Sequence, residues 1–421
     1  MPRAPIHPDL RVAIYTGDTD VSAEKILENA EKRFNIPLTS IPNWRERLDF
    51  VFLTHRWLLE DRYYPAFTLL GQAVGGLLLG FEALWRLVPE TFIDSMGVPL
   101  TLPLFTYVAG SRTGCYVHYP MISTDMIRVV KDRKAAFNNR DVVSKSPILS
   151  WAKLIYYRLF ALLYGLAGRA AHVVMVNGSW TRGHIDQLWA RPTRTYVVYP
   201  PVDTGAFQKL VNQSESIRRD ANRVQIISIA QFRPEKDHAM QLEAFAILKQ
   251  LCRDENVQLK LCLIGGCRND ADYARVSELE KRAKRLEISN DVAFHVNMPF
   301  AEFCDELTRS MIGIHTMANE HFGIGVVELM ASGVIAVAHN SGGPQQDIVV
   351  PANRSKRRIV GLLASDAREY AERMLRVIVD MDPNERDAIR AGARARAIMF
   401  GEERFARSWM QACEKEGLFQ W

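Results

Sequence analysis

The second half of the chain repeats one pattern, in which a short and nearly continuous apolar run ends in a loop and is followed by a helical stretch. Such runs occupy 224–230, 259–264, 292–296, 312–316 and 334–338. Their apolar residues do not alternate with polar ones, so both faces of each strand must be covered. This is typical of parallel sheets with helices on both sides. The pattern therefore predicts a doubly wound α/β domain.

A less regular alternation of the same kind precedes this half. Strands are expected at 10–16, 49–53, 114–117, 171–176 and 195–199. At 421 residues the chain is long enough for two or three domains. We therefore expect an α/β protein of two Rossmann-like, doubly wound domains.

The expected domain limits follow from composition. The N-terminal domain would cover 1–201, the polar stretch 202–222 would be a linker, and the C-terminal domain would cover 223–390. A C-terminal helix within 391–421 would pack back toward the N-terminal domain. Ligands of such sheets bind beyond the carboxyl ends of the strands, so the site is expected in a cleft between the two domains.

Charge and cysteine content narrow the class of protein. The chain has 53 Lys and Arg against 48 Asp and Glu, a net charge of +5. This balance fits a small anionic ligand or a membrane surface and argues against nucleic acid. The six cysteines form no CxxC pair, which argues against a zinc site or a disulfide framework and favours a reducing compartment. Dinucleotide and P-loop glycine motifs are both absent.

Two segments have compositions found at membranes. Segment 66–81 is almost wholly apolar and has two GxxxG spacings, Gly71/Gly75 and Gly76/Gly80. It is either a helix that pairs in lipid or a helix that packs closely inside the protein. Segment 148–169 mixes five aromatic residues with three cations, which is typical either of a helix in a bilayer interface or of an amphipathic core helix. Both alternatives stay open for each segment.

Two loops of the C-terminal half carry candidate binding residues. Arg233 and Lys236 follow the strand at 224–230 and precede a helix, an arrangement that suits a diphosphate. Glu320 and Glu328 flank a glycine loop after the strand at 312–316. Each carboxylate can accept two hydroxyl hydrogen bonds, so the pair could hold a sugar and a ribose. A basic surface turn and an acidic helix N-terminus are the alternatives.

Three further motifs give weaker evidence of a functional site. The loop 338–347 is rich in small residues and suits an anion or a sugar. His118 ends a strand of the N-terminal half and would face the cleft, although a lone histidine is more often structural. Asp270 and Asp272 resemble a DxD metal motif, but their position after Gly265-Gly266 favours a helix N-terminus.

Taken together, these motifs resemble glycosyltransferase family 4, whose fold is GT-B. The strings SIAQFRPEKDHAMQLEAF, HTMANEHFGIGVVELMASG and VHYPMISTDM are similar to those of the α-1,2-mannosyltransferases of the endoplasmic-reticulum dolichol pathway. The resemblance runs from about Arg11 to Phe405. It implies a retaining enzyme that transfers mannose from GDP-mannose to a dolichol-diphosphate-linked core oligosaccharide, adding the fourth and fifth mannoses.

The resemblance also implies roles for individual residues. Arg233 and Lys236 would stabilise the leaving diphosphate, and Glu320 would hold the mannose hydroxyls. Glu328 would hold the ribose, and His118 would contact the sugar from the other domain. The remaining donor contacts would come from Gly265, Gly266, Phe322, Gly323 and Ile324. No metal or other cofactor is expected, because the two cations take that role.

The same resemblance implies the cellular context. The partners would be GDP-mannose, the dolichol-linked oligosaccharide, the membrane surface and other mannosyltransferases of the pathway, with no nucleic acid. The location would be the cytosolic face of the endoplasmic-reticulum membrane.

One departure from the family keeps other functions open. Relatives carry an N-terminal anchor and a glycine-rich loop before the region that matches 10–18, and the first βα unit of the N-terminal domain is therefore expected to be missing. A non-catalytic scaffold and another nucleotide-sugar glycosyltransferase of family 4 are the alternatives.

Overall fold

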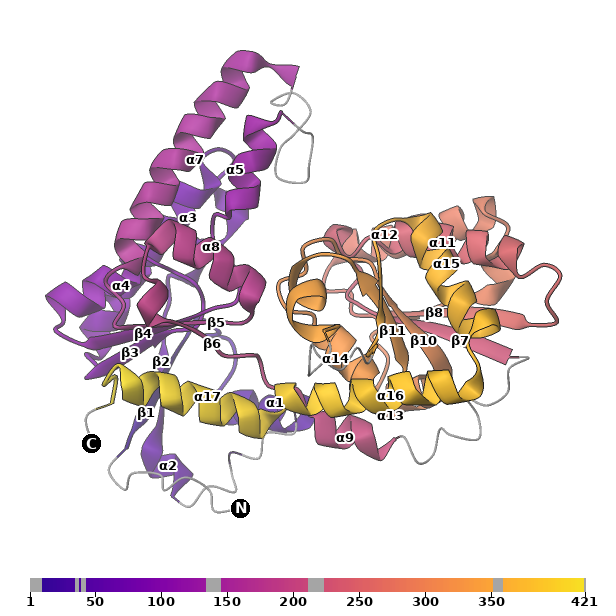
Figure 1. Ribbon diagram of the computed structural model, residues 1–421. Helices are drawn as coiled ribbons and strands as arrows, with labels where there is room; N and C mark the ends of the chain where they lie inside the picture. Colours follow the sequence, from indigo (N-terminus) through magenta and orange to yellow (C-terminus); the bar gives the residue numbers. More distant parts are fainter. Residues whose placement is uncertain are drawn as a thin grey trace. The chain divides into compact units, whose positions relative to one another are not determined.

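The computed structural model describes residues 10–34, 38, 43–133, 145–210, 223–350 and 359–419. The chain forms two compact units (Figure 1). Among the described residues, the first unit holds the chain up to Val176, Thr181–Tyr196 and the chain from Met410 onward. The second holds Asn177–Trp180 and Val197–Trp409.

A six-stranded parallel sheet forms the middle of the second unit. Its strands are β7 (Arg223–Ile229), β8 (Gln258–Gly265), β9 (Val292–Val296), β10 (Ser310–His315), β11 (Ile335–His339) and β12 (Leu362–Ala364). Their order in space is β12-β11-β10-β7-β8-β9. The direction of strand addition therefore reverses between β7 and β10, and open α/β sheets bind ligands beyond the strand ends at such a point.

Helices cover both faces of this sheet (Figure 1). Successive strand residues point to opposite faces, so Ile226 joins one buried apolar cluster and Ile227 joins the other. The first cluster includes residues of α11 (His238–Leu251), α12 (Asp270–Arg285) and α15 (Ala367–Leu375). The second includes residues of α9 (Thr204–Lys209), α13 (Phe300–Arg309), α14 (Ile324–Ala331) and α16 (Pro383–Ala397). The doubly wound α/β prediction is confirmed.

Part of the stretch expected as a linker belongs to the second unit. The carboxylate of Asp203 caps α9 by accepting a hydrogen bond from Ala206 N at 3.0 Å. Phe207 of this helix is buried in the core of the second unit. Residues 204–209 are therefore helical rather than a linker, and 211–222 lie outside the described residues.

The first unit contains two smaller sheets. Strands β1 (Val12–Thr16) and β2 (Leu48–Phe52) pair in parallel. The order in the other sheet is β3 (Thr91–Asp94), β4 (Arg112–Val117), β5 (Val173–Val176) and β6 (Thr195–Val197). The helices are α1 (Ala23–Phe34), α2 (Trp44–Arg47), α3 (Thr68–Arg86), α4 (Thr101–Pro103), α5 (Thr124–Lys131), α7 (Pro147–Gly168) and α8 (Ser179–Trp189).

The C-terminal end of the chain is fixed to β3 and β4 of the first unit. Helix α17 (Glu402–Lys415) passes into this unit at Met410. Beyond it, Arg112 Nη1 donates to Gly417 O at 2.5 Å, and Thr91 Oγ1 donates to Leu418 O at 3.1 Å. The Leu418 side chain is fully buried. Gly417 and Leu418, which follow α17, are therefore packed against the first unit.

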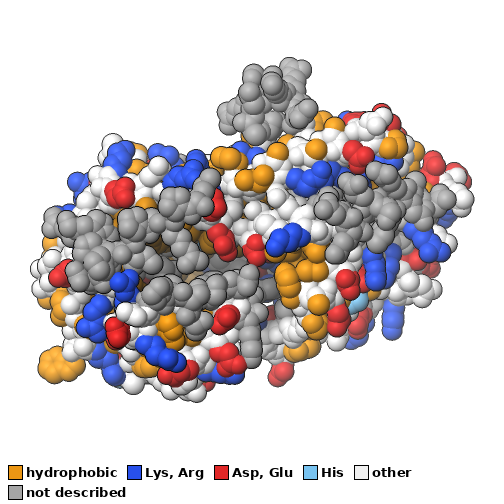
Figure 2. Space-filling view, turned by 90° about the horizontal axis from the view of Figure 1, so that it is seen from below, with side chains coloured by type: hydrophobic (Ala, Val, Ile, Leu, Met, Phe, Trp, Pro, Cys, Tyr) orange, Lys and Arg blue, Asp and Glu red, His pale blue; other side chains and the backbone are white. Residues whose placement is uncertain are grey.

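Charged side chains of both signs are spread over the uncovered part of the face drawn in Figure 2, with hydrophobic side chains between them. Neither sign dominates there, in keeping with the small net charge of +5. A nucleic-acid footprint would need basic residues gathered on one face.

Candidate functional site

Two loops meet at the point where the strand order of the second unit reverses. After β7 the chain makes a single 3-10 turn, Pro234–Lys236, and Asp237 then caps α11 by accepting a hydrogen bond from Met240 N at 3.2 Å. After β10, residues 316–323 lead into α14. Because β7 and β10 are neighbours in the sheet, their following loops lie side by side.

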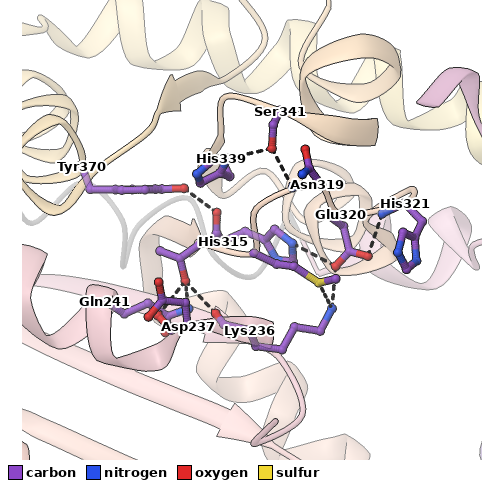
Figure 3. Close-up of polar contacts among 12 residues, drawn as sticks. Lys236, Asp237, Gln241, His315, Asn319, Glu320, His321, His339, Ser341 and Tyr370 are labelled. Atoms are coloured by element: carbon purple, nitrogen blue, oxygen red, sulfur yellow. Dashed lines mark hydrogen bonds and ion pairs between the residues drawn. The ribbon is translucent and has the colours of Figure 1, made fainter. Parts of the chain in front are cut away.

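These loops and the last residue of β10 bring together three polar side chains, which we call the Lys236–Glu320–His315 cluster (Figure 3). Lys236 Nζ lies 2.5 Å from Glu320 Oε2, and His315 Nε2 lies 3.2 Å from the same oxygen. Lys236 Nζ is also 3.1 Å from the Met317 sulfur. Glu320 is 8% exposed and His315 is 5% exposed, so the charges of the cluster are largely withdrawn from water.

The charge state of Glu320 follows from these neighbours. Burial alone would raise the pKa of its carboxyl. The hydrogen bond and charge of His315, together with the charge of Lys236, outweigh burial and hold this pKa well below its usual range. Glu320 is thus a carboxylate at physiological pH, able to accept hydrogen bonds from hydroxyl groups.

Buried polar contacts fix the backbone on both sides of the cluster. Thr316 Oγ1 donates to the carbonyl of Lys236 at 2.8 Å, and Gln241 Nε2 donates to Thr316 Oγ1 at 2.9 Å (Figure 3). Tyr370 OH donates to His315 O at 2.7 Å. The turn that carries Lys236 is thereby tied directly to the end of β10, so the two halves of the cluster are held in register.

The small-residue loop after β11 packs against the backbone of Glu320. Gly343 N donates to Glu320 O at 2.7 Å, and Ser341 Oγ accepts from Asn319 N at 2.7 Å. A Cβ atom on Gly342, whose φ is +60°, would lie 2.3 Å from Glu320 O. This loop, expected to bind an anion or a sugar, thus contacts the Glu320 backbone directly, which explains why small residues are needed there.

The N-terminus of α14 opens beside Glu320. Gly323 precedes the helix with a φ of +108°, a conformation that favours glycine. The first backbone N–H groups of a helix have no partner inside it and can bind a phosphate. Phe322 directs its side chain into the core against Tyr199 and Phe400, so only its backbone is available to a ligand.

Glu328 lies on α14, separate from the cluster. Among the described residues its carboxylate has no ion-pair partner, and burial raises its pKa to about 7. The two carboxylates of the loop and helix therefore differ in charge state. Glu320 is held ionised by cations, whereas Glu328 is poised to gain or lose a proton near neutral pH.

Arg233 takes a different position from Lys236. Its nearest acidic group is Glu235, at 3.9 Å, and no contact joins its guanidinium to Glu320. It lines a pocket of about 390 Å³ together with Arg275 and Arg282. Of the two predicted cations, the structure thus places only Lys236 in the cluster.

Gly265 ends β8 and Gly266 follows it, and both contact the segment that follows β7. A Cβ on Gly265 would lie 2.0 Å from Ala230 O, so no larger residue fits. Phe232 N donates to Gly266 O at 3.2 Å. These glycines support the Arg233–Lys236 turn, and their expected contact with the base stays a prediction.

His118 lies at the carboxyl end of β4 in the first unit. Its ring packs edge-on against Tyr116 with centroids 4.7 Å apart, and burial lowers its pKa. The ring is therefore neutral at physiological pH. Its expected contact with the sugar stays a prediction.

Asp270 and Asp272 occupy the first turn of α12. Asn269 caps this helix by accepting a hydrogen bond from Asp272 N at 3.1 Å, and the buried Asp272 carboxylate accepts one from Arg268 N at 3.1 Å. Both aspartates therefore serve the helix N-terminus. Within the described ranges, no group of three or more His, Cys, Asp or Glu side chains could hold a metal.

Two buried residues of the second unit were not predicted from the sequence. His315 closes a largely apolar strand directly before the Glu320 loop, and a histidine at such a strand end is the signal that could have identified it. Asp347 accepts hydrogen bonds from Ser179 N at 2.7 Å, Ser179 Oγ at 2.6 Å and Tyr199 OH at 2.9 Å. It thereby fixes the segment Asn177–Trp180 to this unit.

Family models match both halves of the chain. The model described as ALG11 mannosyltransferase N-terminus matches residues 4–189, and that described as glycosyl transferases group 1 matches residues 212–396. Among solved structures, an α,α-trehalose 6-phosphate synthase from Burkholderia multivorans is similar with a TM-score of 0.64 and 15% identity, over 88% of this chain and 85% of that one. Anabaena Alr3699/HepE, solved with UDP and glucose, gives 0.60 and 17%, over 98% and 100%.

Curated relatives are far closer in sequence. A protein of Xenopus tropicalis is 48% identical over 407 residues, which are 96% of this chain and 80% of that protein. A human protein is 45% identical over 410 residues, 97% of this chain and 81% of its own length. Both are named GDP-Man:Man(3)GlcNAc(2)-PP-Dol alpha-1,2-mannosyltransferase.

The fold and the matched models define a glycosyltransferase with the two-domain GT-B fold. Within this class, the chain belongs to the family of the GDP-Man:Man(3)GlcNAc(2)-PP-Dol alpha-1,2-mannosyltransferases.

Proposed function

We propose that this protein transfers mannose from GDP-mannose to the 2-hydroxyl of a mannose on a dolichol-diphosphate-linked oligosaccharide. The observation that carries the proposal is the Lys236–Glu320–His315 cluster at the reversal point of the second sheet. A cation and an ionised carboxylate beside a helix N-terminus offer a diphosphate site and a hydroxyl site together. The names of the relatives supply the donor and the acceptor.

Lys236 stabilises the leaving group in this mechanism. The acceptor oxygen forms a bond to mannose C1 while the bond from C1 to the β-phosphate oxygen breaks, and the hydroxyl proton passes to that phosphate oxygen. Negative charge builds on the diphosphate as the bond breaks, and a fixed cation in a partly buried site lowers the free energy of that state. Arg233 adds a second cation when its side chain turns toward the diphosphate.

Glu320 holds the hydroxyl groups of the transferred mannose. Its carboxylate is anchored by Lys236 and His315, so it is positioned as an acceptor for hydroxyl groups. Backbone N–H groups of Phe322, Gly323 and Ile324 bind the phosphate or sugar at the start of α14. Gly265 and Gly266 border the guanine, and a contact of His118 with the sugar is a further part of the proposal.

Glu328 makes donor binding depend on pH. The two ribose hydroxyls donate to its carboxylate, so protonation weakens binding. Its pKa is about 7 in the free protein, and the dissociation constant of GDP-mannose should therefore rise up to about tenfold between pH 8 and pH 6. Calorimetry at both values, with wild type and Glu328→Gln, tests this. An equally steep pH dependence in Glu328→Gln would contradict the role of Glu328.

Transfer should need no divalent metal, because Lys236 and Arg233 take the place of one at the diphosphate. We expect EDTA to leave the initial rate unchanged within about twofold, a margin that corresponds to less than 0.5 kcal/mol. Loss of activity in EDTA and recovery with Mn²⁺ would contradict this expectation. In that case Asp270→Asn and Asp272→Asn variants would show whether that motif binds the ion.

The acceptor gives the expected location and partners. A polyprenyl chain stays in the bilayer, so the enzyme works at a membrane surface, for which we propose the cytosolic face of the endoplasmic reticulum. Other mannosyltransferases of the pathway are expected partners, since they produce and consume its lipid-linked substrates. Nucleic acid is not expected to bind.

Two alternatives are a non-catalytic scaffold and another family 4 enzyme that uses a different nucleotide sugar. The affinity for different nucleotide-sugar donors distinguishes these alternatives from the proposed function. We expect GDP-mannose to bind with a higher affinity than UDP-glucose or UDP-N-acetylglucosamine, and calorimetry with the three donors measures this. A preference for a UDP-sugar would favour the second alternative, and binding of none of them would favour the scaffold.

A further inference from the structure

The second unit has a basic pocket outside the Lys236–Glu320–His315 cluster. Helices α11 and α12 pack on the same face of the sheet (Figure 1). The start of α11, the outer part of α12 and the turn after β7 border a pocket of about 390 Å³, which we call the α11–α12 pocket. Neither Lys236 nor the two glutamates Glu320 and Glu328 line it. Of the residues expected to contact the donor, it contains only Arg233.

Positive charge dominates the lining of this pocket. The acidic residues that line it are Asp237 and Glu278. The carboxylate of Asp237 is already engaged, because it accepts the hydrogen bond from Met240 N that caps α11. Four of the cations recur at helical spacing and so share one face of α12. The five cations that line the pocket are Arg233, Arg275, Lys281, Arg282 and Arg285.

Most of this charge is not neutralised by the protein. Arg282 pairs with Glu243, and the guanidinium of Arg233 lies 3.9 Å from Glu235. Like charges that face one pocket repel one another, and a bound anion relieves that repulsion. Three cations of the lining form no ion pair with any residue that the structure describes: Arg275, Lys281 and Arg285.

Three of the arginines also lack hydrogen-bond partners. Among the described residues, the Nε atoms of Arg233, Arg275 and Arg282 are buried and have no acceptor. Buried polar groups are nearly always hydrogen-bonded, and leaving a charged donor unpaired costs free energy. All three arginines line the α11–α12 pocket. Phosphate oxygens form short, charge-assisted hydrogen bonds with guanidinium groups, so a phosphate in this pocket would supply the missing acceptors.

The size and charge of the pocket indicate the class of ligand. Its volume of about 390 Å³ is that of a small-molecule site. Several cations that are free to bind match a ligand with two or three linked phosphate groups better than one with a single phosphate. Such a group occurs both in inorganic polyphosphates and in nucleotides, and these two sources share the chemistry that the arginines recognise.

We propose that the α11–α12 pocket binds a small anion with two or three linked phosphate groups, and that this anion keeps Arg233 away from the donor diphosphate. Arg233 lines the pocket, whereas the proposed mechanism has it turn toward the diphosphate. One guanidinium cannot occupy both positions. An anion in the pocket therefore weakens the binding of GDP, and GDP weakens the binding of the anion by the same factor. This coupling rests on the proposed function, but binding of the anion does not.

The first test is calorimetry with inorganic pyrophosphate in metal-free buffer. Pyrophosphate can also enter the diphosphate site, so the protein is saturated with GDP. We expect pyrophosphate to bind, and Arg275→Gln and Lys281→Gln/Arg285→Gln each to lower its affinity by at least about tenfold, because each removes charge-assisted contacts. Lys281 and Arg285 are exposed, so the double variant should unfold at the wild-type temperature. Tighter binding of ATP than of pyrophosphate would identify a nucleotide as the ligand, and weaker binding an inorganic polyphosphate.

Lys284→Gln/Arg407→Gln is the matched control. It removes the same charge at exposed positions outside the pocket and should change the affinity for pyrophosphate by less than about twofold. Pyrophosphate that fails to bind to the GDP-saturated protein would overturn the proposal. Equal binding by the pocket variants and the wild type would overturn it as well, since it would show an adventitious ion only.

The second test measures the coupling through Arg233. Saturating pyrophosphate should raise the dissociation constant of GDP to a plateau about five- to tenfold above its value without pyrophosphate. Direct competition at the diphosphate site would instead raise it without limit. The plateau should disappear in Lys281→Gln/Arg285→Gln and persist in Lys284→Gln/Arg407→Gln. Binding of pyrophosphate with no change in GDP affinity would overturn the role of Arg233. Pyrophosphate binding by a protein that transfers no mannose would contradict the proposed function and leave the pocket standing.

Discussion

Replacing Lys236 with alanine is expected to lower the rate of mannosyl transfer by about 10²- to 10³-fold. In the proposed mechanism the ammonium group lies beside the diphosphate and meets the charge that builds as the bond to mannose breaks. Removal of one such donor typically has an effect of this size. The fold should persist, since Thr316 and Gln241 hold the backbone of the turn without the lysine side chain. Steady-state kinetics with saturating donor measure the change.

Lys249→Ala is the matched control for this variant. Lys249 forms an ion pair with Asp291 in the same unit, and both side chains are about one-third exposed. Its removal should leave the rate unchanged. A Lys236→Ala enzyme with near wild-type turnover would contradict the assignment of Lys236 to the leaving group.

Replacing Glu320 with glutamine is expected to lower transfer by a similar factor while sparing the binding of GDP. Glutamine keeps the size of the side chain but removes the charge that pairs with Lys236 and His315. In the proposed mechanism the same charge orients the mannose hydroxyls. GDP carries no mannose, and Lys236 is freed from its ion pair in this variant. The dissociation constant for GDP should therefore stay the same or fall, whereas that for GDP-mannose should rise.

Glu306→Gln separates this effect from a general loss of a buried carboxylate. Glu306 is 9% exposed, and its carboxylate accepts a hydrogen bond from Gln225 Nε2 at 2.7 Å and pairs with Arg309 at 3.3 Å. We expect this variant to lose stability and to keep its turnover number. Equal loss of GDP and GDP-mannose binding in Glu320→Gln would show that Glu320 does not hold the sugar.

The fold was predictable from the sequence wherever a strand has five or more residues and a largely apolar sequence. Strands β7 to β11 have these properties, and each was predicted within two residues of its observed limits. Strands β3 and β12 were missed. They have four and three residues. A run this short shows no clear periodicity and is too short to be distinguished from a loop.

The site was predictable in part. Each of Lys236 and Glu320 could be placed after a strand from local sequence, but their contact spans 84 residues and depends on β7 and β10 being neighbours. Strand order is a property of packing that single segments do not encode. The position of Arg233 away from the cluster depends on side-chain packing beside α11 and α12, which local sequence also does not specify.

Helices α3 and α7 show a further limit of prediction from the sequence. Their compositions left both a core helix and a membrane helix open, because each helix carries apolar residues all around it. Only the packing of Gly75 against Leu58 and the burial of Phe160 show which face is inside. The exposed apolar residues are then left to be explained by a partner.

The most direct test of the proposed function is transfer to the lipid-linked acceptor itself. Purified protein is incubated with GDP-mannose and dolichol-diphosphate-linked Man3GlcNAc2 in anionic vesicles, and the released glycans are analysed by mass spectrometry before and after α-1,2-mannosidase. We predict products with one and two additional mannoses, both removed by the mannosidase and both absent with Lys236→Ala. An acceptor that stays unchanged while the wild type binds GDP-mannose would contradict the proposed function.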